Sequence, residues 1–520
     1  MSFKQVAAGA FATALAVVVS AQEPPESGAS LTYADGIVIP ATPPVVSGIT
    51  VSHGSFTGTP TVTGALMGTA TLGTAITPKP APANATTYPS DGKLHDPQPA
   101  PYVPGGGLGT NGTMPVYNAK SDFDFQSLAL ATYVQWIKLD LFRYGLSRFT
   151  EEEFRKAGLN SEDRYLIQFM AEQEIGHATM LSNILGRAAP MQCNYNYPNF
   201  TDVREWLDFC QKLTRNGEAG VYGFLPHLNS REAAAMLLRA VTTSARQHVI
   251  FRQLEGLFPM PEWFEVGIPQ SWSWSLIAPY VASCPANQTR LVWQNFPALR
   301  VINQPNPVRT NGSAAVNETL GPWLNSLNNT NIPPQQLCNE TECGPAITSN
   351  RSIPLSQPGR QVLLQWDAPG KPIGPNNSYV TDSIAGQPAY VAWVTQLNVT
   401  YSLLTDVMTS GGAGGGQNST NSTGGGGVGG KGGMNISRRQ TNNGTTGGNG
   451  TTGGGGGSQG KGSRMTGRTI QPDLSTYEGD PAINGTIFIA ITDTNLFLTP
   501  FNLSLINPHV VAGPAVYQAG

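Results

Sequence analysis

The sequence predicts a mainly α protein: a four-helix bundle preceded by a disordered segment and followed by a loop-rich, partly β region. Apolar side chains recur at spacings of three and four residues, the period of a helix, between residues 122 and 257. The chain of 520 residues contains 60 glycines and 41 prolines, and only 12% of its residues are charged. Such a composition is typical of chains with long segments that do not pack a core.

Residues 1–21 have the pattern of a secretory signal peptide. Lys4 provides a basic start, an apolar run follows from Val6 to Val19, and Val19-Ser20-Ala21 resembles a cleavage site. We therefore expect a secreted, extracellular protein. No later apolar stretch is long enough to span a bilayer, so no transmembrane anchor is expected. The formal net charge of −3 gives no reason to expect nucleic acid as a partner.

Many Asn-x-Ser/Thr triplets support the secreted interpretation, and we expect surface glycans on some of them. The triplets include those that begin at Asn84, Asn111, Asn199, Asn287, Asn311, Asn317, Asn339, Asn398, Asn435, Asn484 and Asn502.

Five cysteines are compatible with two disulfides and one thiol. They are Cys193, Cys210, Cys284, Cys338 and Cys343. Cys338 and Cys343 are close enough to close a small loop, whereas Cys193 could pair with Cys210 or either of them with Cys284. None of the spacings resembles a zinc site.

The expected bundle occupies residues 121–286, after a Pro-, Gly- and Thr-rich segment over residues 22–120. The first helix is expected to end at Gly145, the second to begin after an Asn160 cap, and the fourth to begin with a capping box at residues 229–232. Three glycines in the third helix suggest a kink or a close helix contact. The predicted helices are residues 122–144, 161–185, 202–226, 231–255 and a short fifth helix at 272–281.

Beyond the bundle, short β-prone runs lie between Pro, Asn and Gly clusters, as at residues 362–364, 389–391 and 487–491. We assign residues 287–410 to a loop-rich β-prone region and residues 466–520 to a β-prone C-terminal segment. Between them, residues 411–465 form a Gly/Asn/Ser/Thr tract, a composition typical of flexible linkers.

The candidate site lies on the second helix, where Glu174 and His177 both fall on the apolar stripe. A buried carboxylate without a partner is costly, so this pair requires a metal or a hydrogen-bond network. The stripe of the fourth helix carries His248, and Glu218 on the third helix is a fourth candidate ligand. Carboxylate and imidazole ligands together suit iron or manganese.

A carboxylate-bridged di-metal bundle takes one Glu from each of two helices and Glu-x-x-His from each of the other two. Here Gln135 and Ala245 stand where two of the carboxylates are expected. We therefore expect either no cofactor or a single iron or manganese ion held by Glu174, His177, Glu218 and His248. Without a metal, these groups would form a buried polar network, with Lys138 or Arg246 neutralising Glu174.

Four sequence pieces carry a resemblance to a known family: residues 171–177, residues 220–223, Arg246-Gln247-His248, and the weaker Ser283-Cys284-Pro285. In these pieces the run from residue 122 to 284 resembles the secreted ferritin-like domain family, which includes plant desiccation-related proteins and fungal stress-response and late-sexual-development proteins. The resemblance implies a ferritin-like bundle and Glu174, His177 and His248 as ligands.

The leading hypothesis is a secreted, glycosylated protein of the stress or developmental type that is not an enzyme, with a degenerate di-metal site. The first alternative is an iron- or manganese-binding oxidoreductase. The second is a cell-wall or surface-associated adhesion protein that contacts wall glycans. A homo-oligomer is left open, because no surface of the sequence can be singled out as an interface.

Aromatic residues between positions 261 and 274 have two interpretations. Trp263, Phe264, Trp272 and Trp274 could stack on sugars, or they could pack over the open end of the bundle. Packing is the interpretation we favour.

Overall fold

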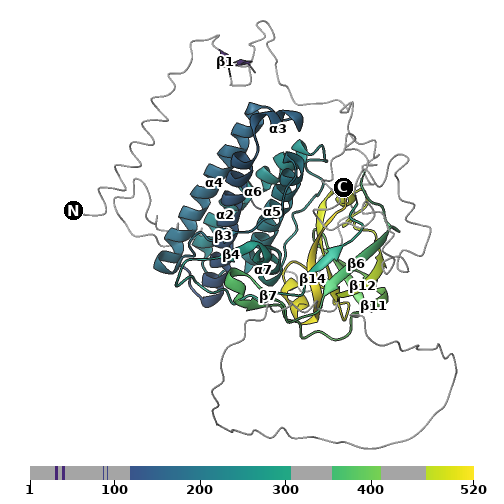
Figure 1. Ribbon diagram of the computed structural model, residues 1–520. Coiled ribbons are helices and arrows are strands. Elements are labelled where there is room, and N and C mark those ends of the chain that lie inside the picture. Colours follow the sequence, from purple (N-terminus) through teal and green to yellow (C-terminus); the bar gives the residue numbers. More distant parts are fainter. Residues whose placement is uncertain are drawn as a thin grey trace, which may run out of the picture.

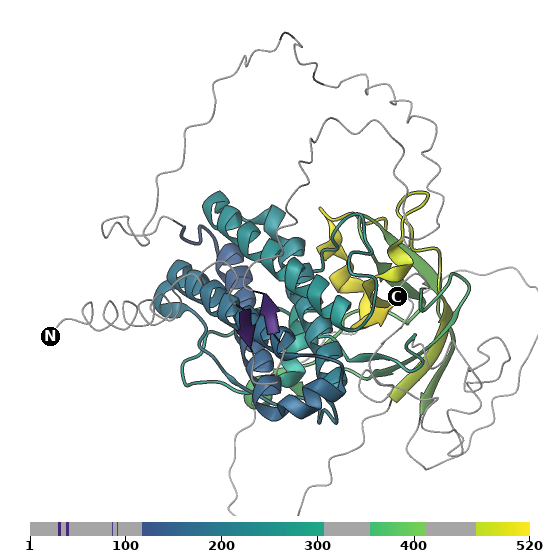
Figure 2. The same cartoon turned by 90° about the horizontal axis from the view of Figure 1, so that it is seen from above.

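A computed structural model describes residues 117–305, 354–410 and 464–520, the isolated residues 86 and 91, and the backbone of strands β1 (Ser30–Thr32) and β2 (Val38–Pro40). A bundle of long helices lies beside a β-rich unit formed by the second half of the chain (Figure 1). The view from above shows the same two parts side by side (Figure 2). In the described ranges, no helix combines the length and the apolar character needed to cross a membrane.

The four predicted bundle helices are confirmed. They are α2 (Asp122–Arg148), α4 (Ser161–Leu185), α5 (Val203–Phe224) and α6 (Arg231–Leu254). The predicted Asn160 cap of α4 is a full capping box, because Asn160 and Asp163 exchange side-chain-to-backbone hydrogen bonds. At α6, Ser230 accepts from Ala233 N, but Glu232 accepts from Lys120 instead of closing the expected capping box.

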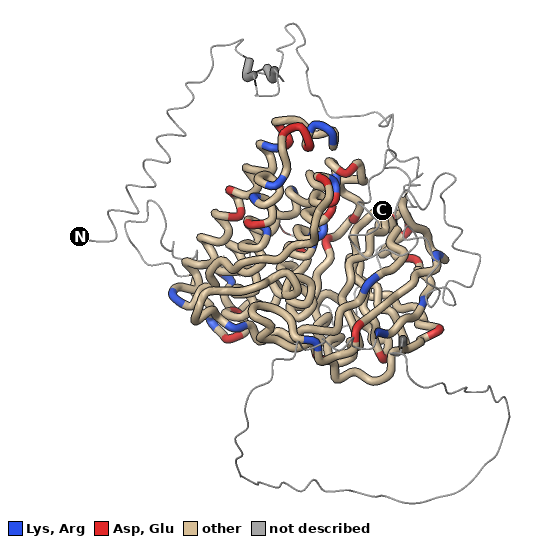
Figure 3. Tube along the Cα trace, viewed as in Figure 1, with Lys and Arg blue, Asp and Glu red and all other residues tan. Residues whose placement is uncertain are grey.

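Helix α2 continues beyond Gly145, where the sequence analysis ended it. A Cβ added at Gly145 would lie 1.9 Å from the nearest ring atom of Trp206. The glycine therefore lets the buried indole of α5 press against the backbone of α2, and it does not end the helix. After α2 comes a short helix that we did not predict, α3 (Glu151–Lys156), with acidic residues in its first turn and basic residues in its last (Figure 3).

The glycines of α5 mark close contacts, one of the two expectations for them. A Cβ at Gly223 would lie 1.9 Å from the backbone oxygen of Ile268, and one at Gly220 would lie 2.7 Å from Ser273 Oγ. The segment after α6 therefore packs directly on the α5 backbone. It leads into α7 (Gln270–Ile277), which begins and ends earlier than the predicted 272–281 helix. Ala278–Tyr280 form a 3-10 turn, and Val281 already belongs to β4 (Val281–Ser283), which pairs with β3 (Asn194–Tyr195).

Two four-stranded antiparallel sheets form the β-rich unit. The first has the order β10-β9-β13-β14, and the second has the order β11-β12-β6-β5. Their bounds are β5 (Leu299–Val301), β6 (Gln361–Asp367), β9 (Tyr390–Val394), β10 (Val399–Leu403), β11 (Thr405–Ser410), β12 (Arg464–Ile470), β13 (Thr486–Thr492) and β14 (Val510–Gln518). A two-stranded ribbon of β7 (Pro372–Ile373) and β8 (Tyr379–Val380) lies outside these sheets.

Strand β13 joins the two parts of the molecule, because both of its faces are buried. Ile487, Ile489 and Ile491 pack into the core between the two sheets. Phe488 and Ala490 point the other way, into a core shared with α5 and α7. A run of consecutive apolar residues is what a strand covered on both faces requires.

The segments on either side of the low-complexity tract belong to the same sheet. Ser410 at the end of β11 pairs with Arg464 at the start of β12. The β-prone residues before and after the tract, which we assigned to separate segments, therefore build one unit. The C-terminal boundary of the tract, expected at residue 465, lies no later than residue 463.

Candidate functional site

A lysine and a glutamate occupy the centre of the bundle. Lys138 Nζ of α2 donates to Glu174 Oε1 of α4 at 3.0 Å and to Ser244 Oγ of α6 at 3.0 Å. The side chains of Lys138 and Glu174 are both fully buried. Of the two residues expected to neutralise Glu174, Lys138 makes the contact, whereas Arg246 is exposed and donates to Thr243.

His177 lies one helical turn after Glu174, as its spacing predicts. Its Nδ1 is 3.5 Å from Glu174 Oε2, and its side chain is 13% exposed. Burial alone would raise the pKa of Glu174, but Lys138 and His177 together hold that pKa below its ordinary value. Glu174 is therefore an ionised carboxylate inside the bundle, paired with an ammonium group.

Glu218 and His248 form a second buried pair. His248 Nδ1 is 2.9 Å from Glu218 Oε1, and His248 Nε2 is 2.8 Å from Gln211 Nε2. An amide nitrogen can only donate, so His248 Nε2 accepts and Nδ1 carries the proton that goes to Glu218. Burial lowers the pKa of His248 despite the neighbouring Glu218, which agrees with a neutral ring.

Arg215 balances the charge of Glu218 and extends the network toward the β-rich unit. Its guanidinium is fully buried and donates to Glu218, Glu262 and Glu265 at 2.7–2.8 Å. Its Nε donates to the backbone oxygen of Thr486 in β13 at 3.0 Å. Burial alone would raise the pKa of Glu218, but His248 and Arg215 together hold that pKa below its ordinary value.

Arg252 of α6 makes the second connection to the β-rich unit. It donates to Thr486 Oγ1 at 2.9 Å, to the backbone oxygen of Gly520 at 2.7 Å, and to that of Asn484. Neither Arg215 nor Arg252 was a candidate in the sequence analysis. No local sequence pattern marks this role, because the acceptors in the β-rich unit, Asn484, Thr486 and Gly520, lie more than two hundred positions away along the chain.

The four candidate ligands form two separate pairs and not one metal site. Glu174 with His177 forms one pair, and Glu218 with His248 forms the other. Among the residues that the structure describes, no group of three or more His, Cys, Asp and Glu side chains could hold a metal ion. Lys138 lies against the carboxylate that a metal would bind, and Arg215 does so for Glu218. This donor set does not fit a di-metal centre.

Some carboxylate capacity remains within the described bundle. Glu174 Oε2 and Glu218 Oε2 are buried and have no hydrogen-bond partner there, and the same holds for the Oε1 atom of Gln135. Two single oxygen atoms on different pairs fall short of the four carboxylates and two histidines of a di-metal bundle. Gln135 and Ala245 thus remain the missing carboxylates that the sequence indicated.

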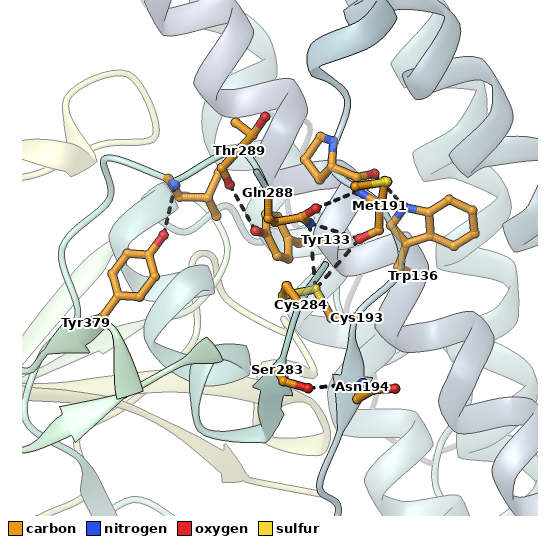
Figure 4. The surroundings of a disulfide bond; sticks show 12 residues. Tyr133, Trp136, Met191, Cys193, Asn194, Ser283, Cys284, Gln288, Thr289 and Tyr379 are labelled. Atoms are coloured by element: carbon orange, nitrogen blue, oxygen red, sulfur yellow. Dashed lines mark hydrogen bonds between the residues drawn. A yellow bond between two sulfur atoms is a disulfide. The ribbon is translucent and has the colours of Figure 1, made fainter. Parts of the chain in front are cut away.

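One of the cysteine pairings left open is present, the bond between Cys193 and Cys284 (Figure 4). The bond is flanked by reciprocal hydrogen bonds between Gln288 and Met191, at 2.9 and 3.1 Å, and by Asn194 donating to Ser283. It fastens the loop after α4 to the segment that leads from α7 into the β-rich unit. Among the described cysteines, Cys210 is the free thiol and is buried, while Cys338 and Cys343 lie outside the described residues.

The expected glycan sites differ in their exposure. Asn199, Asn287 and Asn398 are exposed, and Asn502 is half-buried. Asn484 is only 5% exposed, and its backbone oxygen accepts from Arg252, so a glycan at this position does not fit the folded protein. The other expected sites, at Asn84, Asn111, Asn311, Asn317, Asn339 and Asn435, lie outside the described residues.

Comparison with known proteins agrees with the geometry of the bundle. The family described as "Ferritin-like domain" matches residues 123–257, which cover α2 to α6. Protein rds1 of Schizosaccharomyces pombe is 44% identical over 424 residues, an alignment that covers 81% of this chain and 87% of that protein. The alignment therefore reaches far beyond the bundle into the β-rich unit. The chain belongs to the family of protein rds1, whose helical part is a ferritin-like domain.

Proposed function

We propose that the chain is a secreted, glycosylated ferritin-like protein of the stress or developmental type, and that it is not an enzyme. The observation that carries the proposal is the position of Lys138 between Glu174 and Ser244, at 3.0 Å from each. An ammonium group there supplies the positive charge that a metal would otherwise bring to Glu174. The bundle core then serves as a stable scaffold held by ion pairs.

Secretion is supported by two independent features. Residues 1–21 have the signal-peptide pattern, and the Cys193–Cys284 disulfide is of a kind that persists in oxidising compartments. Glycans fit at the exposed Asn199, Asn287 and Asn398. N-terminal sequencing of protein collected from the medium, before and after endoglycosidase treatment, tests both points: we expect a start at Gln22 and a loss of mass.

The metal question is tested by elemental analysis of the purified secreted protein, beside Glu174→Ala and His177→Ala. We expect iron and manganese well below one ion per chain in all three proteins. One ion per chain in the wild type, lost in both variants, would overturn the proposal. It would favour the second candidate function, an iron- or manganese-binding oxidoreductase that uses Glu174, His177, Glu218 and His248. The observation in favour of this candidate is that Glu174 Oε2 and Glu218 Oε2 are buried without a hydrogen-bond partner in the described residues.

The stress or developmental role follows from the family resemblance, and a deletion strain tests it. We expect the strain to survive drying less well or to complete sexual development less often, and we expect wild type and His177→Ala to restore it equally. Failure of His177→Ala, despite secretion at the wild-type level, would show that the function needs this imidazole and would count against a scaffold.

A further inference from the structure

Three aromatic side chains from distant parts of the sequence form an exposed group, which we call the aromatic platform. Trp263 and Phe264, in the segment after α6, are 49% and 42% exposed, and Tyr477, in the segment before β13, is 55% exposed. The Phe264 and Tyr477 rings lie 6.2 Å apart between centroids, at an interplanar angle of 63°. The Trp263 ring lies against Gly479, 3.9 Å from the place of a Cβ.

The packing that we favoured for the aromatic residues of this region therefore holds for only half of them. Trp272 and Trp274 are completely buried, the former in the core shared with β13 and the latter inside the bundle. Trp263 and Phe264 stay at the surface. Buried rings are explained by the core that they fill, whereas a group of exposed rings is typical of a binding surface.

Buried hydrogen bonds hold the platform in place. Gln396 and Asp480, 3% and 8% exposed, bond to each other between the two segments. Gln396 Oε1 accepts from the backbone nitrogen of Phe264 at 2.6 Å. Asp480 accepts from the backbone nitrogens of Thr476 at 2.8 Å and Ala482 at 3.1 Å. The backbone segments that carry the rings are thus held in place before any partner arrives, which lowers the entropic cost of binding.

The platform has acidic surroundings. Residues 258–266 and 473–480 together contain five acidic residues and no Lys, Arg or His; these are Glu262, Glu265, Asp473, Glu478 and Asp480. Three carboxylates, from Glu218, Glu262 and Glu265, share the single guanidinium of Arg215. The Glu265 side chain, 42% exposed, lies next to Phe264 in the sequence. Burial, and then the charge of Glu218, raise its pKa to about 7, so this carboxyl adds negative charge to the surface from about neutral pH upward.

We propose that the aromatic platform binds an amino-sugar polymer, such as a chain of β-linked glucosamine units. The flat faces of pyranose rings carry C–H groups that pack on aromatic rings, and a protonated amine is attracted both to carboxylates and to the faces of such rings. The acidic surroundings disfavour an anionic polysaccharide, because like charges repel. A neutral glucan has no positive group that could pair with the carboxylates. The proposal depends on secretion only for access to such a polymer in the cell.

The test uses the purified full chain and chitosan-coated beads near neutral pH, where the amines and Glu265 are both partly charged. Beads of β-1,3-glucan, acetylated chitin and polylysine are the comparison probes. We expect retention on chitosan, with about tenfold weaker binding for Trp263→Ala/Tyr477→Ala and for Glu265→Gln/Glu478→Gln. The matched control is Phe497→Ala, which removes a ring that is 90% exposed in the segment between β13 and β14. Circular dichroism checks that each variant keeps the wild-type fold.

Each outcome bears on the proposal. Binding to chitosan that both double variants weaken, and that Phe497→Ala does not, supports it. Equal retention on glucan or chitin would overturn the amino-sugar assignment, and equal retention on polylysine would show that charge alone is recognised. No retention on chitosan would overturn the proposal outright. None of these results depends on metal content or on export, so failure here is distinct from failure of the proposed function.

Discussion

The ammonium nitrogen of Lys138 lies 3.0 Å from Oε1 of Glu174, and neither side chain is exposed to solvent. This ion pair connects α2 to α4 in the middle of the bundle. Ser244 of α6 accepts a second hydrogen bond from the same ammonium, so three of the four helices meet at one nitrogen atom.

Lys138→Met should destabilise the protein by about 3–5 kcal/mol, because it leaves the Glu174 carboxylate buried without its counter-charge. Urea unfolding followed by circular dichroism measures the change. Lys138→Met/Glu174→Leu, which removes both charges, should recover most of the loss. If the double variant is no more stable than Lys138→Met, the pair does not act as a charge-compensating unit.

Glu255, at the end of α6, should make stability fall as the pH rises. Its carboxyl is completely buried, and neither oxygen has a hydrogen-bond partner in the described structure. Burial, and then the charge of Asp208, raise its pKa well above the ordinary 4.5. The folded state therefore keeps a proton that the unfolded state releases, so this stabilisation is complete below pH 4.5 and is lost as the pH rises through the folded-state pKa.

Glu255→Gln should remove this contribution to the pH dependence, whose slope is at most about 1.4 kcal/mol per pH unit. Urea midpoints of wild type and variant between pH 5 and pH 8 (roughly the range in which native proteins are most stable) give the comparison. The exposed Glu172→Gln on α4 is the control. Parallel curves for wild type and Glu255→Gln would show that Glu255 is ionised throughout.

Arg252→Ala should loosen the attachment of the β-rich unit to the bundle. The guanidinium donates to the backbone oxygens of Phe258, Asn484 and Gly520 and to Thr486 Oγ1. Its removal leaves the oxygens of Phe258 and Asn484 without this donor, at a cost of about 1–3 kcal/mol for each group left unpaired, whereas Thr486 and Gly520 keep Gln211 and Gln518 as donors. Hydrogen exchange should rise in β13 and β14 more than in α2. Arg246→Ala, which removes an exposed arginine of the same helix, should leave exchange unchanged; the same rise in both variants would contradict a specific role for Arg252.

Loss of the disulfide should cost about 2–5 kcal/mol, as is typical for native disulfides, when Cys193 and Cys284 are both changed to Ser. Thermal unfolding of the oxidised protein, the reduced protein and the double variant measures this. Reduction should lower the melting temperature of the wild type and leave that of the variant unchanged. An equal drop in both would assign the effect to cysteines other than this pair.

The helices of the bundle could be predicted because their signals are local. The Asn160 and Asp163 capping residues and the apolar stripes of α4 and α6 need only a few neighbouring residues to be recognised. Gly145 was wrongly predicted to end the first helix, because its role depends on Trp206. That residue lies in another helix, so a local sequence pattern does not show the contact.

The candidate site was predictable only in part for the same physical reason. The stripe positions of Glu174 and His248 correctly placed both in the interior, and Lys138 was named as one of two neutralising partners. Arg252 could not be found, because its acceptors Asn484 and Thr486 reach it only through the pairing of β13 within a sheet assembled from distant strands.

The pairing of Ser410 with Arg464 has a consequence for how this chain tolerates change. Ser410 and Arg464, which flank residues 411–463 in the sequence, are held side by side by the pairing of β11 with β12. Doubling the length of a flexible loop adds only about 0.6 kcal/mol to the cost of closing it. Insertions, deletions or an affinity tag between these two residues should therefore change the stability of the fold little, which makes residues 411–463 a suitable place to engineer the protein.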